Sequence, residues 1–166
     1  MQLEELYDYK NLLMKHLCCD AEVVKTVTGN DDAVVPNHDL PYYQIFPFEY
    51  IPETVNDAKT FICFDMDIVS VPNKTVYIPV IYVWVCAHKS QLRAKEGGCT
   101  LDKMAVAVNR LLNGNRYYGL GKLKLDSVRR FQPITDYYGR ALTFYSKDFN
   151  EKWAKPDIPS NRKEGT

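Results

Sequence analysis

The stretch from Phe61 to His88 constrains the fold more than any other part of this sequence. It holds two runs of β-branched and aromatic residues on either side of a short turn at Pro72-Asn73. Such a pattern predicts an antiparallel β-hairpin. In the first run apolar side chains alternate with Asp65 and Asp67, so one face of that strand is expected to meet water or polar partners.

The second strand of this hairpin, residues 75–88, is apolar on both faces. Tyr82 and Trp84 fall on one face, and Ile81 and Val83 fall on the other. A strand of this kind is covered on both faces. The chain is short for supplying both covers, so the second cover is expected either from another subunit or from the rest of the same domain.

Composition limits the class of protein. The chain has 166 residues, with 21 Lys plus Arg balanced by 21 Asp plus Glu. We expect one α/β domain over residues 1–150, including an arm at 30–59, and a C-terminal tail at 151–166. Zero net charge argues against bulk binding of nucleic acid or of an anionic membrane surface. Five cysteines, an odd number with no Cys-x-x-Cys pair, predict no disulfide framework, and no cofactor or metal is predicted.

The N-terminus begins with an acidic segment rather than an apolar signal core, and no apolar run reaches membrane-spanning length. The protein is therefore expected to be made in a cytoplasm and to work there, or in something assembled there.

The arm at residues 30–59 combines regularly spaced prolines with many aromatic residues. Prolines disfavour a regular helix or a central strand, whereas the aromatic residues are unlike a flexible linker. We expect an extended arm or loop that lies over a surface, either its own or a neighbour's. The tail carries Trp153 and is expected to be disordered when alone.

The remaining periodicity predicts three helices and a second pair of strands. Asp20 and Thr100 are expected to be the N-caps of the second and third helices. The fold class is therefore α+β, with a four-stranded, mainly antiparallel sheet and helices on one face. The expected helices are 1–18, 21–28 and 101–113, and the further strands are 117–132 and 141–146.

Few residue patterns point to chemistry. Asp65 and Asp67 are paired carboxylates on one strand face that could hold a divalent metal, given a third acid and a positioned lysine. The alternative is an exposed or interface-facing strand. Cys86 and His88 lack zinc spacing, and the segment 119–122 lacks the length of a phosphate-binding loop. No catalytic residue is predicted.

Two stretches carry a family resemblance. They are residues 61–89, with Tyr82-Val83-Trp84-Val85-Cys86-Ala87-His88-Lys89, and residues 101–150, with Leu111-Leu112-Asn113-Gly114, Gly119-Leu120-Gly121-Lys122-Leu123, Gly139-Arg140-Ala141-Leu142-Thr143-Phe144 and Asp148-Phe149-Asn150. The chain resembles the neck and tail-terminator proteins of tailed bacteriophages and prophages. The resemblance implies a small fold in the order helix, hairpin, helix, hairpin. It covers most of the chain, residues 1–150, but the aromatic arm and the C-terminal tail do not map onto the family's pattern.

The resemblance implies a non-enzymatic virion protein that is assembled in the bacterial host cytoplasm. Such proteins form a ring, commonly a hexamer, that caps the tail tube and joins it to the head connector. The implied partners are further copies of the chain, the tail tube protein and the connector proteins, with DNA passing through the ring. A connector adaptor or another tail protein is the alternative.

Aromatic side chains are the candidate contact residues, because aromatic anchors dominate many protein interfaces. One contact is assigned to the arm through Tyr42, Tyr43, Phe46, Phe48 and Tyr50, and another to the tail through Trp153. Two rival classes remain at this point. One is a metal-dependent, nuclease-like enzyme that uses Asp65 and Asp67. The other is a host-side binding module, such as a small phage-encoded inhibitor.

Overall fold

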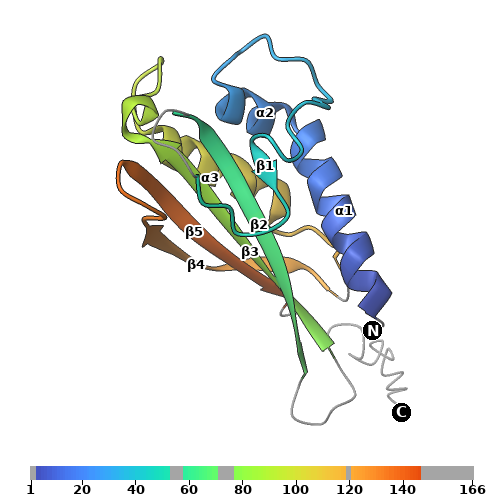
Figure 1. The fold of residues 1–166 in the computed structure, drawn as a ribbon. Helices are drawn as coiled ribbons and strands as arrows, with labels where there is room; N and C mark the ends of the chain where they lie inside the picture. Colours follow the sequence, from blue (N-terminus) through green and yellow to red (C-terminus); the bar gives the residue numbers. More distant parts are fainter. Residues whose placement is uncertain (1–2, 53–57, 71–76, 119–120, 147–166) are drawn as a thin grey trace, which may run out of the picture.

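The structure is a computed structural model that describes residues 3–52, 58–70, 77–118 and 121–146. The predicted turn at 72–74, the segment 119–120 and the tail with Trp153 lie outside the described residues. Figure 1 shows the helices beside a twisted sheet. The elements are α1 (Leu3–Cys19), α2 (Ala21–Thr28), β1 (Ile45–Phe46), β2 (Thr60–Ser70), β3 (Tyr77–His88), α3 (Thr100–Leu112), β4 (Leu123–Phe131) and β5 (Tyr137–Ser146).

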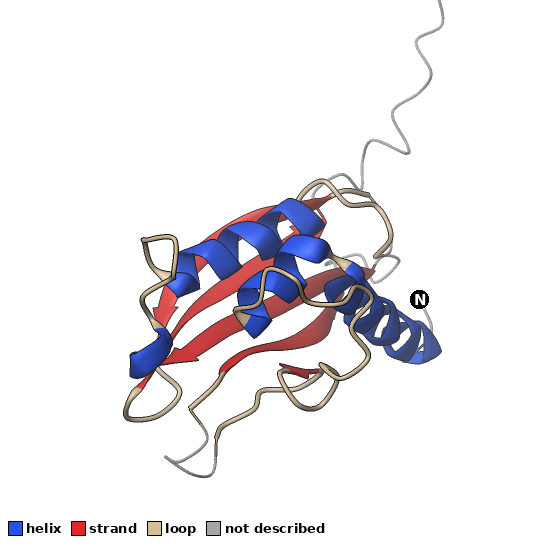
Figure 2. Ribbon diagram, turned by 90° about the horizontal axis from the view of Figure 1, so that it is seen from above, coloured by secondary structure: helices blue, strands red, loops and turns tan. Residues whose placement is uncertain are grey.

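The sheet has five strands in the order β1-β2-β3-β5-β4. The β2–β3, β3–β5 and β4–β5 pairs are antiparallel, whereas β1 lies parallel to β2. The helices lie on one face of the sheet, as Figure 2 shows. The predicted α+β class, the order of elements and the one-sided helices are confirmed. The prediction of four strands is wrong, because it omitted β1.

The register of the first hairpin agrees with the alternation in the sequence. Ile62 lies opposite Val85, and Asp65 lies opposite Tyr82. Paired residues of an antiparallel ladder share a face, so the aspartates and Tyr82 lie on the face away from the helices. We call this the outer face, and the opposite side the helix face.

The helix face carries the main core. Side chains from all three helices pack there on alternate residues of β2, β3 and β5, and Phe64, Ile81 and Phe144 are fully buried. This apolar layer accounts for the stripes seen at helical spacing in the sequence. No helix in the described part of the chain is long and apolar enough to cross a membrane.

Helix caps were predicted with mixed success. Asp20 caps α2, because its Oδ1 accepts a hydrogen bond from the backbone N of Val23 at 2.9 Å. Thr100 does not cap α3, so that prediction is wrong: the N-cap is Cys99, which makes no side-chain capping bond. The Thr100 hydroxyl instead donates to the carbonyl of Gln91 at 2.7 Å.

The strand that the prediction omitted, β1, belongs to the arm. In the described part of the arm, β1 has two residues at the sheet edge, where proline nearby is tolerated. The Ile62 backbone N donates to the Gln44 carbonyl at 2.7 Å. The Gln44 amide donates in turn to the carbonyls of Val27 and Thr60. These long-range bonds fix the arm on its own domain.

The second hairpin differs from prediction at its ends. β4 is shorter than the predicted strand 117–132, and β5 begins four residues before the predicted 141–146. Tyr118 precedes β4 and belongs to the core, where its ring is fully buried and meets Tyr9 and His16 of α1 edge-on. A bulge between Leu125 and Ser127 shifts the β4–β5 register.

Candidate functional site

The arm packs on one end of the outer face and builds a second, smaller core there. The ring of Phe46 stacks on Tyr50 with centroids 3.9 Å apart, and both rings meet Phe61 edge-on. Phe46 is only 4% exposed. Two of the five predicted arm contacts, the buried Phe46 and the half-buried Tyr50, therefore pack the arm onto its own domain.

The other predicted arm residues face solvent. Tyr42 is 67% exposed, Tyr43 is 56% exposed and Phe48 is 43% exposed, and Ile51 beside them is also exposed. We call these four residues the arm surface. The rings of Tyr42 and Phe48 lie 6.4 Å apart, so part of the surface is contiguous. A cluster of exposed aromatic side chains is typical of a protein interaction site.

Lys59 ties the arm surface to the packed rings. Its Nζ lies 5.0 Å from the ring centroid of Tyr43 and 5.1 Å from that of Tyr50. A cation over aromatic faces is stabilising, by about 0.5–1 kcal/mol at an exposed site. The exposed and the buried aromatic residues of the arm therefore share one cation.

Beyond the arm, the outer face stays partly open. Tyr82 stacks on Trp84 at 6.0 Å in the middle of β3, and both side chains are half-buried. Trp84 also approaches Phe131 of β4 at 6.4 Å. The arm therefore supplies the second cover for one end of β3, and Trp84 packs at the border of this smaller core, where it stays half-buried like Tyr82.

The paired aspartates do not form a convergent site in the described residues. The Asp65 carboxylate accepts a hydrogen bond from Lys10 of α1 at 2.9 Å and also binds the backbone N of Met66. Asp67 is exposed and accepts a hydrogen bond from Tyr82, whose pKa is raised by desolvation and by this bond. No group of three His, Cys, Asp or Glu side chains in the described segments is arranged to hold a metal.

The thiols and His88 near the hairpin are packed. Cys63 and Cys86 are buried under the arm, and a hydrogen bond to Cys63 together with burial raises the pKa of Cys86. A thiol held in its neutral form is a poor nucleophile. His88 Nδ1 lies 2.8 Å from the Ser90 hydroxyl and caps the short turn that follows β3.

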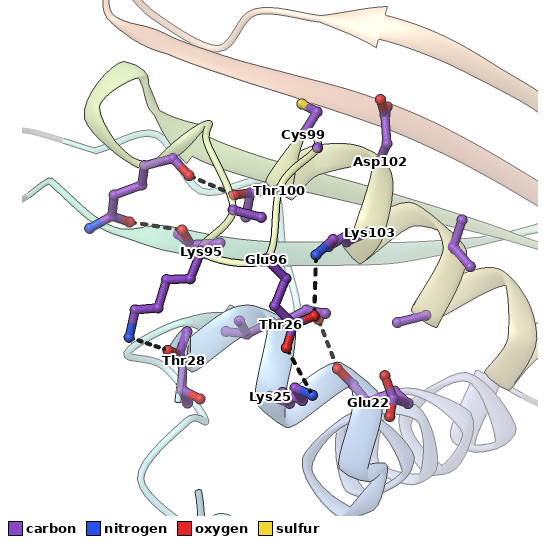
Figure 3. A pocket seen from close by; sticks show the side chains of 18 of the residues that line it. Glu22, Lys25, Thr26, Thr28, Lys95, Glu96, Cys99, Thr100, Asp102 and Lys103 are labelled. Atoms are coloured by element: carbon purple, nitrogen blue, oxygen red, sulfur yellow. Dashed lines mark hydrogen bonds and ion pairs between the residues drawn. The ribbon is translucent and has the colours of Figure 1, made fainter. Parts of the chain in front are cut away.

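A groove on the helix face was not predicted. It has a volume of about 990 Å³ and lies between the end of α2, the start of α3 and the loop 91–99. Figure 3 shows charged side chains of both signs pointing across it. Tyr43 of the arm surface and Lys59 line its far end, so groove and arm surface are continuous.

Ion pairs hold the loop against the two helices. The Glu96 carboxylate lies 3.8 Å from Lys25 of α2 and 3.6 Å from Lys103 of α3 (Figure 3). Lys95 donates to the carbonyl of Gly29 at the end of α2, at 3.2 Å. All of these groups are partly exposed, so each pair is worth little alone. The sequence feature that could have indicated the groove is the charged pair Lys95-Glu96 directly before Gly97-Gly98.

A buried polar contact links α1 to the core. The ring nitrogen Nδ1 of His16 hydrogen-bonds the hydroxyl of Tyr118. Burial raises the pKa of Tyr118, and burial together with the charge of Lys15 lowers the pKa of His16. Near neutral pH the phenol therefore donates to a neutral imidazole.

Comparison with known proteins assigns the chain to a family. A family model described as YomW matches residues 13–145, which include β1 to β4, α2, α3, residues 13–19 of α1 and all of β5 but its last residue. The chain belongs to the YomW family. None of the curated proteins matches it. A chain from the "Virion of native gene transfer agent (GTA) particle" is similar at 17% identity and a TM-score of 0.42, covering 63% of this chain and 77% of that chain.

Proposed function

We propose that this YomW-family protein is a structural virion protein at the head–tail neck of a phage-type particle. In this proposal it is not an enzyme. It forms a ring that caps the tail tube and joins it to the connector, and its partners are copies of itself, the tube protein and connector proteins. A connector adaptor or another tail protein is the alternative position within the particle.

The observation that carries the proposal is the arm surface. Phe46 and Tyr50 hold the arm to the domain, and this leaves Tyr42, Tyr43 and Phe48 presented to solvent on a fixed support. Preorganised aromatic groups lose little side-chain entropy when a partner covers them. The sequence resemblance to neck and tail-terminator proteins and the open middle of the outer face also support a protein that works in an assembly.

Deleting the gene in a host that produces the particles tests this proposal. We expect the protein in purified wild-type particles by mass spectrometry, and separate heads and tails, with tails of irregular length, in the deletion strain. Complementation with the wild-type gene should restore joined particles. Normal joined particles from the deletion strain, or absence of the protein from purified particles, would contradict the proposal.

A further inference from the structure

The sheet has two edges that lack a full strand partner in the described part of the chain. β4 ends the strand order on one side. On the other side, β1 pairs with Ile62 and Cys63, and among the described residues no strand pairs with 64–70 of β2; there Lys10 of α1 binds Asp65, whose carboxylate also accepts a hydrogen bond from the backbone N of Met66. Lys10 and Asp65 protect part of this edge, and the remainder, around Asp67 and Val69, is a surface that another chain can cover.

The two edges carry opposite charges on the same face of the sheet. On β4, Lys124 and Arg129 lie on the outer face, as the pairing with Tyr145 and Ala141 shows, and both are exposed. Arg130 adds a third exposed cation on the helix face, against one exposed acid, Asp126, at the bulge.

On β2 the outer-face charges are Asp65 and Asp67. Asp67 is exposed, and its neighbour on β3 is Val80, so no basic residue lies opposite it in the ladder. Asp65 is bound by Lys10, which reaches the same edge from α1. Because Lys10 offsets the charge of Asp65, the β2 edge keeps a net negative charge through Asp67, whereas the β4 edge carries three exposed cations against one acid.

This charge pattern discriminates between ways of joining two copies. Two β4 edges, or two β2 edges, repel each other, whereas a β4 edge attracts a β2 edge. β2 and β4 run in opposite directions within the sheet, so a neighbour in the same orientation presents its β2 antiparallel to β4. The helices of both copies then stay on one side. A contact between two different surfaces of the same protein is heterologous, and it closes into a ring or extends as a filament.

We propose that copies of this chain join head to tail, with the basic β4 edge of one copy beside the acidic β2 edge of the next, and with Arg129 and Asp67 on the two sides of the junction. The inference rests on the proposed function, since it specifies the contact that builds the ring. It adds that the outer face with Tyr82 and Trp84 becomes continuous from copy to copy.

Charge reversal tests this junction in the purified full-length protein. We expect the wild type to self-associate in sedimentation velocity at low salt. Arg129→Glu and Asp67→Lys should each weaken self-association by about tenfold or more, because each makes the two edges alike. Mixing the two variants should restore assembly, because each then supplies the edge that the other needs. The double variant Arg129→Glu/Asp67→Lys should also assemble.

Matched controls carry the same charge changes on the helix side. Arg110→Glu on α3 and Glu22→Lys on α2 change exposed charges on helices rather than on either edge strand, and they should leave self-association unchanged. Circular dichroism melting should show that all variants fold. Equal effects in the controls, no effect of either edge variant, failure of the mixture to assemble, or a monomeric wild type at all concentrations would overturn the proposal.

The outcome is separable from that of the proposed function. If the protein is present in particles but the edge variants assemble normally, the junction is wrong and the virion role stands. If the edge variants behave as expected but the protein is absent from particles, the junction stands and the virion role fails.

Discussion

Two phenylalanines of the arm, two positions apart, should have opposite consequences when truncated. Phe46 is 4% exposed, stacks on Tyr50 at 3.9 Å and meets Phe61 edge-on, whereas Phe48 is 43% exposed. Truncating a buried Phe to Ala typically costs about 3–5 kcal/mol. We expect about 3 kcal/mol for Phe46→Ala, at the low end because the arm lies at the periphery and can relax. Phe48→Ala should cost about 1 kcal/mol or less.

Urea unfolding monitored by tryptophan fluorescence measures this difference, and hydrogen exchange locates it. In Phe46→Ala the amide of Ile62, which donates to the Gln44 carbonyl at 2.7 Å, should exchange faster because the arm detaches more often. Phe48→Ala should keep wild-type exchange there but weaken binding to a partner. Phe46→Leu is the control that retains apolar volume. Equal destabilisation by both alanine variants, or unchanged Ile62 exchange in Phe46→Ala, would refute the division of the arm into a packed and a presented set.

Three further predictions concern the rest of the domain. Gly139→Ala should lower the free energy of unfolding in urea by about 1–3 kcal/mol, because the new methyl would lie 2.9 Å from the Val85 carbonyl oxygen and 3.1 Å from the Phe131 ring. A variant as stable as the wild type would refute this prediction. The pKa of His16 is lowered in the folded state, so the unfolded chain binds the proton more readily. The free energy of unfolding of the wild type should therefore fall as pH drops below about 6.5, and it should fall less steeply in His16→Gln. Parallel pH profiles of the two proteins would exclude His16 as the cause. Glu96→Gln should speed hydrogen exchange in the loop 94–98, because it removes the charge that binds Lys25 and Lys103. Global stability should change by less than about 1 kcal/mol, because both ion pairs are partly exposed. Unchanged exchange would show that the loop is held by other contacts.

Local patterns predicted much of the fold. The alternation along β2 and β3 determined which side chains share a face, and the helical spacing located α1, α2 and α3 to within two residues at each end. Asp20 was recognisable as a cap because its side chain bonds its own helix three residues on. These features depend on neighbours in sequence, where periodicity and capping rules apply directly.

Features that depend on distant contacts were not predictable in the same way. The arm's position depends on Gln44 reaching both Val27 and Thr60, and on Phe61 as a support for Phe46. Nothing within the arm separates the buried Phe46 from the exposed Phe48. Thr100 was misassigned as a cap because its hydroxyl finds the Gln91 carbonyl. The groove was missed because Glu96 meets Lys25 across seventy residues of sequence.

The most direct test of the account is residue-resolution imaging of intact particles that contain this protein. We predict that density at the neck fits the domain, and that Tyr42, Tyr43 and Phe48 of each copy are covered by a neighbouring copy, the tube protein or a connector protein. Finding those three side chains exposed to solvent in the assembled particle would contradict the account.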